Sequence, residues 1–211
     1  MAHISSAPAS KPGHLNTKLV LWSVLLVASI WVFLSNEVLL MIDYPLFHAY
    51  REKMSLDRWL LVPHAVCGSL AFIIGPFQFS SRIRQRYLNL HRLMGRCYVI
   101  AVYCAALTAI ATVWGSAALP GNGTQAVVWM LTTTIAWVLA RNGHIQVHRQ
   151  WVARSYAVTF TFVSLRVLSV WPTYWNLSDA ANVSVTIGAT FASILVADLI
   201  MVWPDISRRR T

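Results

Sequence analysis

Charged side chains are scarce in this chain of 211 residues, because Asp, Glu, Lys and Arg together make up only 11%. A soluble domain usually carries about 25%. Hydrophobic residues make up 57%, so the composition excludes a soluble globular fold and an intrinsically disordered chain. Cysteine is also rare. Cys67, Cys97 and Cys104 lie in apolar stretches and form no Cys-x-x-Cys pair, which argues against a disulfide scaffold and a thiolate zinc site.

Long apolar runs are the main feature that the chain does have. A helix needs about 20 mostly apolar residues to cross the hydrocarbon core of a bilayer. Six segments meet this requirement, at approximately 18–36, 59–79, 92–116, 125–143, 151–173 and 184–203. They predict an all-α membrane protein, a six-transmembrane helix bundle over 18–207. A disordered tail is expected at 1–17 and a short basic tail at 208–211.

The basic residues predict the orientation of these spans. The chain has 17 Lys and Arg residues and only 7 Asp and Glu residues. Thirteen of the basic residues flank one side of the predicted membrane, three flank the other, and the last, Arg166, lies within a span. Cytoplasmic loops are enriched in Lys and Arg. We therefore expect an inner-membrane protein with both termini in the cytoplasm. Membrane lipids then explain the net charge of +10, and nucleic acid is not needed as a partner.

Two segments on the expected cytoplasmic side resemble each other. Residues 91–98 read HRLMGRCY and residues 148–156 read HRQWVARSY. Both open a helix at the same membrane edge, which favours a duplicated helical hairpin made of spans two and three and spans four and five. Arginine and tyrosine at this depth also serve as contacts to lipid headgroups. A histidine in both copies has no such role, so His91 and His148 are the more informative residues.

Polar residues inside the spans are candidates for function, because they are costly in a membrane. His64 and Gln78 bracket a strip of small residues on one face of the second span, formed by Gly68, Ala71 and Gly75. Such a strip either lets another helix approach closely or leaves a slot for a flat ligand.

Two charged residues inside later spans need partners. Arg166 shares a helix face with His148 and lies near His64 in depth, so it either binds an anion or extends to the outer surface. Asp198 in the last span is expected to pair with Arg96 or Arg154.

The order of these motifs resembles that of a known family. Along the chain come His64, GPFQ at 75–78, HRxxGRxY at 91–98, Trp137, HRxWxxRSY at 148–156 and Arg166. This arrangement resembles the bacterial predicted integral membrane proteins called domain of unknown function 2306, over about residues 60–167. The resemblance implies a multi-pass α-helical membrane protein and supplies no established activity. This chain departs from the family pattern at Val152, where methionine is usual, and at His144, where an acid is common.

A fold-level analogy to the transmembrane b-type cytochromes suggests a cofactor. In those proteins, histidines on alternate helices ligate haem iron. His91 and His148 lie on alternate spans at equal depth and could be the axial ligands of one haem b near the cytoplasmic edge. Arg92, Arg149 and Arg154 could then neutralise the haem propionates.

The sequence therefore favours a redox membrane protein that binds a b-type haem or a quinone-like ligand between spans two and five. His64, Gln78 and Arg166 belong to the same set of candidate binding residues, and a quinone or a redox protein would be the partner. One alternative is a small-molecule or ion transporter that uses His64, Arg166 and Asp198. Another is a non-catalytic assembly or lipid-binding protein. Whether the protein is an enzyme is left open.

Overall fold

The computed structural model describes residues 58–168 and 172–208, together with positions 23, 27, 30 and 31. The side chains of Arg58, Arg166, Val167, Pro172, Trp175 and 204–208 fall outside this description. Most of the expected first span at 18–36 and the whole expected tail at 1–17 also lie outside the described residues. So does the expected C-terminal tail, apart from the backbone of its first residue, Arg208.

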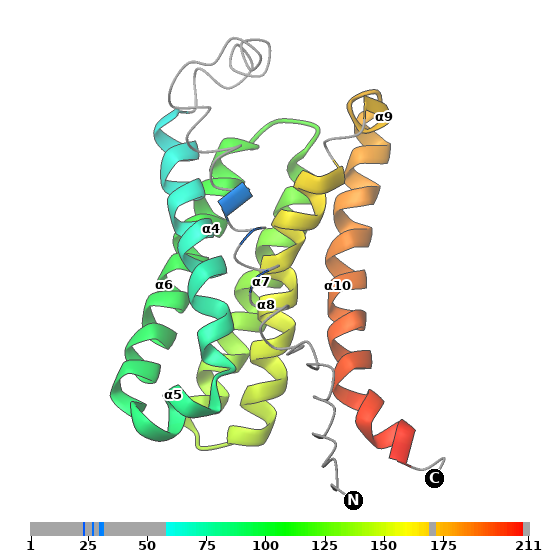
Figure 1. Cartoon of the computed structure of the whole chain (residues 1–211). Helices are drawn as coiled ribbons and strands as arrows, with labels where there is room; N and C mark the ends of the chain where they lie inside the picture. Colours follow the sequence, from blue (N-terminus) through cyan, green and yellow to red (C-terminus); the bar gives the residue numbers. More distant parts are fainter. Residues whose placement is uncertain (1–22, 24–26, 28–29, 32–57, 169–171, 209–211) are drawn as a thin grey trace, which may run out of the picture.

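Within the described ranges, the chain is helical and contains no strand. The elements are α4 (Arg58–Gln78), α5 (Ser81–Arg86), α6 (Leu88–Thr112), α7 (Leu119–Arg141), α8 (Ile145–Leu168), α9 (Pro172–Trp175) and α10 (Asp179–Arg208). The five long helices alternate in direction around the bundle (Figure 1). As a result α4 ends where α6 and α8 begin. We call this the histidine end, since His91 and His148 lie in the first turns of α6 and α8.

Four of these helices are long and apolar enough to cross a membrane: Trp59–Gln78, Leu88–Thr112, Leu119–Arg141 and Asp179–Trp203. The described part thus supports a multi-pass helical membrane protein. The expected fifth span at 151–173 corresponds to α8, which is long enough but too polar to count among the four.

Four helices begin four to six residues earlier than the sequence predicts. α6 begins at Leu88 instead of 92, α7 at Leu119 instead of 125, α8 at Ile145 instead of 151, and α10 at Asp179 instead of 184. In α7, proline lies in the first turn, where its missing N–H costs nothing. The Gly-rich stretch that follows it reads as a loop in the sequence but is helical. α7 and α8 are joined by only three residues, 142–144, and Gly143 makes the turn with a φ of 78°.

The polar character of α8 follows from its place in the bundle. It contacts α4, α7 and α10 and is hydrogen-bonded to α6. Its Ser155 and Thr159 are completely buried. Because a buried hydroxyl needs a partner where water is absent, α8 can carry these groups only if its neighbours pair with them.

Those partners form one connected network around Tyr98 of α6. The Tyr98 hydroxyl lies 2.9 Å from Ser155 Oγ and 2.8 Å from Thr159 Oγ1. Thr133 Oγ1 of α7 lies 2.7 Å from Ser155 Oγ, and Trp129 Nε1 donates to Thr159 Oγ1 over 2.9 Å. The network therefore joins α6, α7 and α8 through side-chain hydrogen bonds in the bundle interior.

The small residues of α4 serve mainly in helix packing. Ala71 is fully buried, and Gly75 lies against the ring of Tyr156 from α8 so closely that any β-carbon there would overlap the ring. The Tyr156 hydroxyl also donates to Phe72 O over 3.3 Å. At Gly68, in contrast, a β-carbon would meet nothing within 4 Å. Of the two uses that the sequence allows for this strip, close packing is the one seen at Ala71 and Gly75.

This contrast predicts opposite effects for two glycine substitutions a heptad apart. Gly75→Ala should lower stability by about 1–3 kcal/mol, because the new methyl overlaps the Tyr156 ring. Gly68→Ala should be neutral or stabilising by up to about 1 kcal/mol, because alanine is the better helix former. Thermal unfolding of the purified protein in one detergent measures both. Equal behaviour of the two variants would contradict the placement of Tyr156.

The thiols of Cys67 in α4 and Cys104 in α6 are close enough to interact electrostatically, and all three cysteines are free. A membrane-permeant oxidant such as copper phenanthroline should therefore join Cys67 to Cys104 within one chain. Mass spectrometry after alkylation detects the loss of two thiols. Cys104→Ser should prevent the cross-link, whereas the matched variant Cys97→Ser should leave it intact. A cross-link through Cys97 would show that α4 and α6 pack in another register.

Candidate ligand site at the histidine end

His91 and His148 occupy equivalent positions, each being the fourth residue of its helix. Their backbone N–H groups make equivalent first-turn hydrogen bonds, His91 to Tyr87 O over 3.0 Å and His148 to His144 O over 2.9 Å. The two imidazoles are also close enough to interact electrostatically. The structure thus brings together, at one end of the bundle, the two histidines that the sequence singles out.

The imidazole of His148 is held in one orientation. Its Nδ1 lies 2.7 Å from Ala136 O in α7. A carbonyl can only accept, so Nδ1 carries the hydrogen and the lone pair of the neutral ring is on Nε2. A backbone carbonyl that fixes the tautomer in this way is a common feature of metal-binding and proton-transferring histidines.

Two buried polar atoms at the seam of α4 and α6 have no hydrogen-bond partner in the described part of the chain: Gln78 Nε2 and His91 Nδ1. The Gln78 side chain lies against α6, since its Oε1 would be 3.4 Å from a β-carbon on Gly95. Gly95 follows His91 by one helical turn on the same face. Leaving such an atom unpaired costs about 1–3 kcal/mol, so this pair indicates a place where a ligand supplies the missing acceptor.

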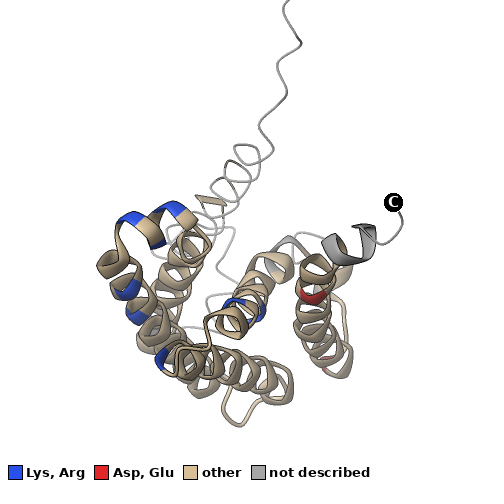
Figure 2. Ribbon diagram, turned by 90° about the horizontal axis from the view of Figure 1, so that it is seen from below, with Lys and Arg blue, Asp and Glu red and all other residues tan. Residues whose placement is uncertain are grey.

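The surroundings of His91 are strongly basic. Arg84 of α5 and Arg92 both act on its ring electrostatically. Seen from this end, the basic residues gather along one side of the bundle and near its centre (Figure 2). Arg92 and Arg149 are exposed. The site therefore favours a ligand with oxygen acceptors or negative charge.

Arg154 forms an ion pair with the last helix. Its Nε lies 2.9 Å from Asp198 Oδ1 of α10, and its guanidinium also lies 4.9 Å from the centre of the Trp151 ring. Of the two partners expected for Asp198, the structure selects Arg154. Arg154 therefore links α8 to α10, and its positive charge is paired with the carboxylate of Asp198.

His64 is not part of this cluster. It precedes Gln78 by 14 residues, about 21 Å along α4, and so lies toward the opposite end. Its Nδ1 is 2.8 Å from Ala105 O, and its ring is 5.6 Å from that of Phe162. Arg166 lies toward the same opposite end of α8, but its side chain is outside the described part. His64 and Gln78, which bracket one strip of the sequence, therefore belong to two different sites.

Sequence reasoning missed the groups that hold the site together. The acceptor of His148 is a backbone carbonyl, and the surface under Gln78 is a glycine of another helix. Neither carries a side-chain signal. The described residues contain no group of three or more His, Cys, Asp or Glu placed to hold a metal ion, so His91 and His148 could ligate a metal only as a pair.

Comparison with known proteins gives one match. The family model DUF2306, described as a predicted membrane protein, matches residues 61–201. No curated protein and no solved structure matches the chain. The match covers α4 to most of α10 and so includes the whole cluster at the histidine end.

The unpaired amide predicts an unusual response to substitution. Gln78→Leu should raise the stability of the ligand-free protein by about 1 kcal/mol or more, because it removes a buried donor without a partner. Gln125→Leu is the matched control. Gln125 is also buried, but its Nε2 donates to Thr161 Oγ1, so this variant should be less stable. Thermal unfolding in detergent compares them. A loss of stability in Gln78→Leu would show that the amide has a partner within the protein.

Proposed function

The chain belongs to the DUF2306 family of predicted membrane proteins, and we propose that it is a membrane redox protein that binds a quinone-like ligand at the histidine end, between α4, α6 and α8. One observation carries the proposal: Gln78 Nε2 and His91 Nδ1 are buried, lie on the same seam and lack a partner in the described part. Both are hydrogen-bond donors when the Nδ1 of His91 is protonated, and quinone carbonyls are pure acceptors.

A quinone supplies the redox chemistry when bound, taking up two electrons and two protons to become the quinol. His91 and Gln78 would hold its carbonyl oxygens and orient the ring. Arg84 and Arg92 favour the negative charge that arrives with electrons, because their positive charge is close to His91 and only partly screened there. His148 presents a fixed Nε2 lone pair and is suited to accept or pass a proton next to His91.

The orientation that fits this role is the one the charge distribution predicts. Most of the described basic residues are at the histidine end: Arg82, Arg84, Arg86, Arg92, Arg96, Arg141, Arg149 and Arg154. By the positive-inside rule this end faces the cytoplasm of a plasma membrane, with both termini on that side. The exposed arginines would then contact anionic lipid headgroups, and a ligand carried in the bilayer would enter from the lipid.

A b-type haem between His91 and His148 is the second candidate. It is favoured by the equivalent positions of the two histidines on α6 and α8 and by the Nε2 lone pair of His148, which would be available to ligate iron. The face of α6 beyond Tyr98 leaves no room for a macrocycle, because Val102 and Ala105 have no exposed surface. A haem would therefore be confined to the outermost turns of these helices.

Quinone binding can be tested on the full chain purified in detergent, with a short-chain ubiquinone analogue as the probe. We expect saturable binding that weakens at least tenfold in His91→Ala, where a hydrogen bond is lost, and in Gln78→Leu. Arg149→Ala, an exposed substitution at the same end, is the matched control and should bind as the wild type does. Equal affinity in all four proteins, or no binding to the wild type, would refute the proposal.

An absorption spectrum separates the two candidates. The quinone proposal expects no stoichiometric Soret band in the purified protein and no α-band after reduction with dithionite. A stoichiometric band that disappears in both His91→Ala and His148→Ala would instead assign the site to haem. Growing the producing cells with added haem precursor ensures that an empty haem site does not result from a shortage of cofactor.

A further inference from the structure

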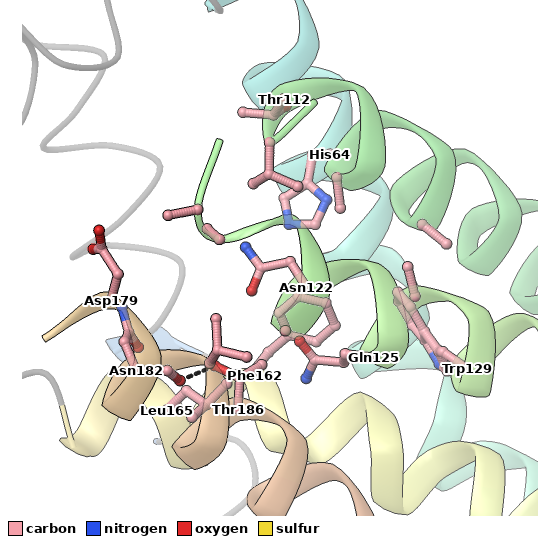
Figure 3. Close-up of a pocket in the computed structure, with 18 of the residues that line it drawn as sticks. His64, Thr112, Asn122, Gln125, Trp129, Phe162, Leu165, Asp179, Asn182 and Thr186 are labelled. Carbon is pink, nitrogen blue, oxygen red and sulfur yellow. Dashed lines mark hydrogen bonds between the residues drawn. The ribbon is translucent and has the colours of Figure 1, made fainter. Parts of the chain in front are cut away.

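A cavity lies at the end of the bundle opposite to the histidine end. Its volume is about 340 Å³, and it is lined by residues of α4, α6, α7, α8, α9 and α10. Figure 3 shows His64, Asn122 and Gln125 around one space, with Trp129 on one side and Asp179 on the other. This volume is near the lower limit of small-molecule sites, which usually measure about 300–1,000 Å³.

The cavity is a consequence of small side chains on closely spaced helices. Ala106 and Ala109 of α6 and Ala126 of α7 form part of its wall. Nearby, α7 and α10 approach so closely that a β-carbon on Gly121 would lie 3.2 Å from Val183 Cα. The helix backbones on that side are therefore held by direct contact, and the space beside them cannot be removed by a small inward shift of α10.

The polar groups around this space include acceptors as well as the donors that the amides of Asn122 and Asn182 bring. Gln125 is 7% exposed, and its Nε2 is used in the bond to Thr161. No group in the described part of the chain donates to its Oε1, which is not among the buried unpaired atoms and so is accessible from the cavity. The Nδ1 of His64 donates to Ala105 O. Asp179 adds a carboxylate.

The charge and the aromatic rings of the cavity lining favour a positively charged ligand. Among the described residues that line the cavity, Asp179 is the only one with a formal charge, and neither Lys nor Arg is present. The rings of Trp129 and Phe162, 5.1 Å apart, form an aromatic wall. Aromatic faces attract organic cations, and a carboxylate at the edge of a low-dielectric cleft raises the local concentration of cations.

We propose that this cavity is a binding site for a small organic ammonium ion, with an amine of one positive charge on a compact aromatic or alkyl body. The ammonium group donates to Gln125 Oε1 and is attracted by Asp179, and the apolar body lies against Trp129 and Phe162. This site is separate from the proposed quinone site, since it lies at the other end of α4, α6 and α8 and uses none of the same residues.

Three probes of nearly the same shape and different charge test the proposal: 2-phenylethylammonium, 2-phenylethanol and phenylacetate. Calorimetry on the full chain in detergent should give binding of the ammonium at least tenfold tighter than that of the alcohol, and no binding of the carboxylate. Asp179→Asn, at an exposed position that tolerates substitution, should reduce this preference at least fivefold. The matched carboxylate variant Asp198→Asn, near the other end of α10, should leave it unchanged.

A second variant tests the cavity itself. Ala109→Phe places a ring in the space and should abolish binding of the ammonium, while an unchanged melting temperature shows that the fold persists. His91→Ala should bind all three probes as the wild type does. The quinone site and the ammonium site can therefore be refuted independently of each other. Equal affinity for the ammonium and the alcohol, or full binding in Ala109→Phe, would overturn the proposal.

Discussion

The bundle depends on the pairing of hydroxyl groups between α8 and its neighbours. In an apolar environment an unpaired buried polar group costs several kcal/mol, and α8 has a row of them facing inward. Tyr98, Thr133 and Trp129 provide the complementary donors and acceptors. Apolar side chains alone would hold membrane helices together only weakly, because lipid competes equally for apolar surface. The hydroxyl network specifies which helices meet and in which register.

Two atoms at the seam of α4 and α6, Gln78 Nε2 and His91 Nδ1, are an exception to this pairing of polar groups. Elsewhere in the described interior, polar side chains find partners at 2.7–3.0 Å around Tyr98. Gln78 and His91 do not, although both lie beside a helix that contains many carbonyl and hydroxyl acceptors. A second histidine and two arginines act on the ring of His91, and a ligand that accepts hydrogen bonds, as proposed above, would remove the cost of the unpaired atoms.

Much of this arrangement could be predicted from the sequence. The apolar runs located α4, α6, α7 and α10, and the repeated His-Arg pattern placed His91 and His148 at one end of parallel helices. The pairing of Asp198 with Arg154 was one of two expected partners. What the sequence could not reveal depends on contacts between distant segments: the carbonyl of Ala136 that orients His148, the close approach of Tyr156 to Gly75, and the thiol contact of Cys67. The helix starts were wrong by four to six residues, because the first turns carry polar residues, such as Asn122 in α7 and Gln146 in α8, that lie outside the apolar runs.

The three-residue connection between α7 and α8 bears on how the protein enters the membrane. α8 by itself is too polar to insert as an independent span, since its inward hydroxyls would face lipid unpaired. The turn at Gly143 folds α8 directly back onto α7. There Thr133 pairs with Ser155, and Trp129 pairs with Thr159. We therefore expect the two segments to insert as one helical hairpin, so that lengthening this connection would harm biogenesis before it harmed the finished structure.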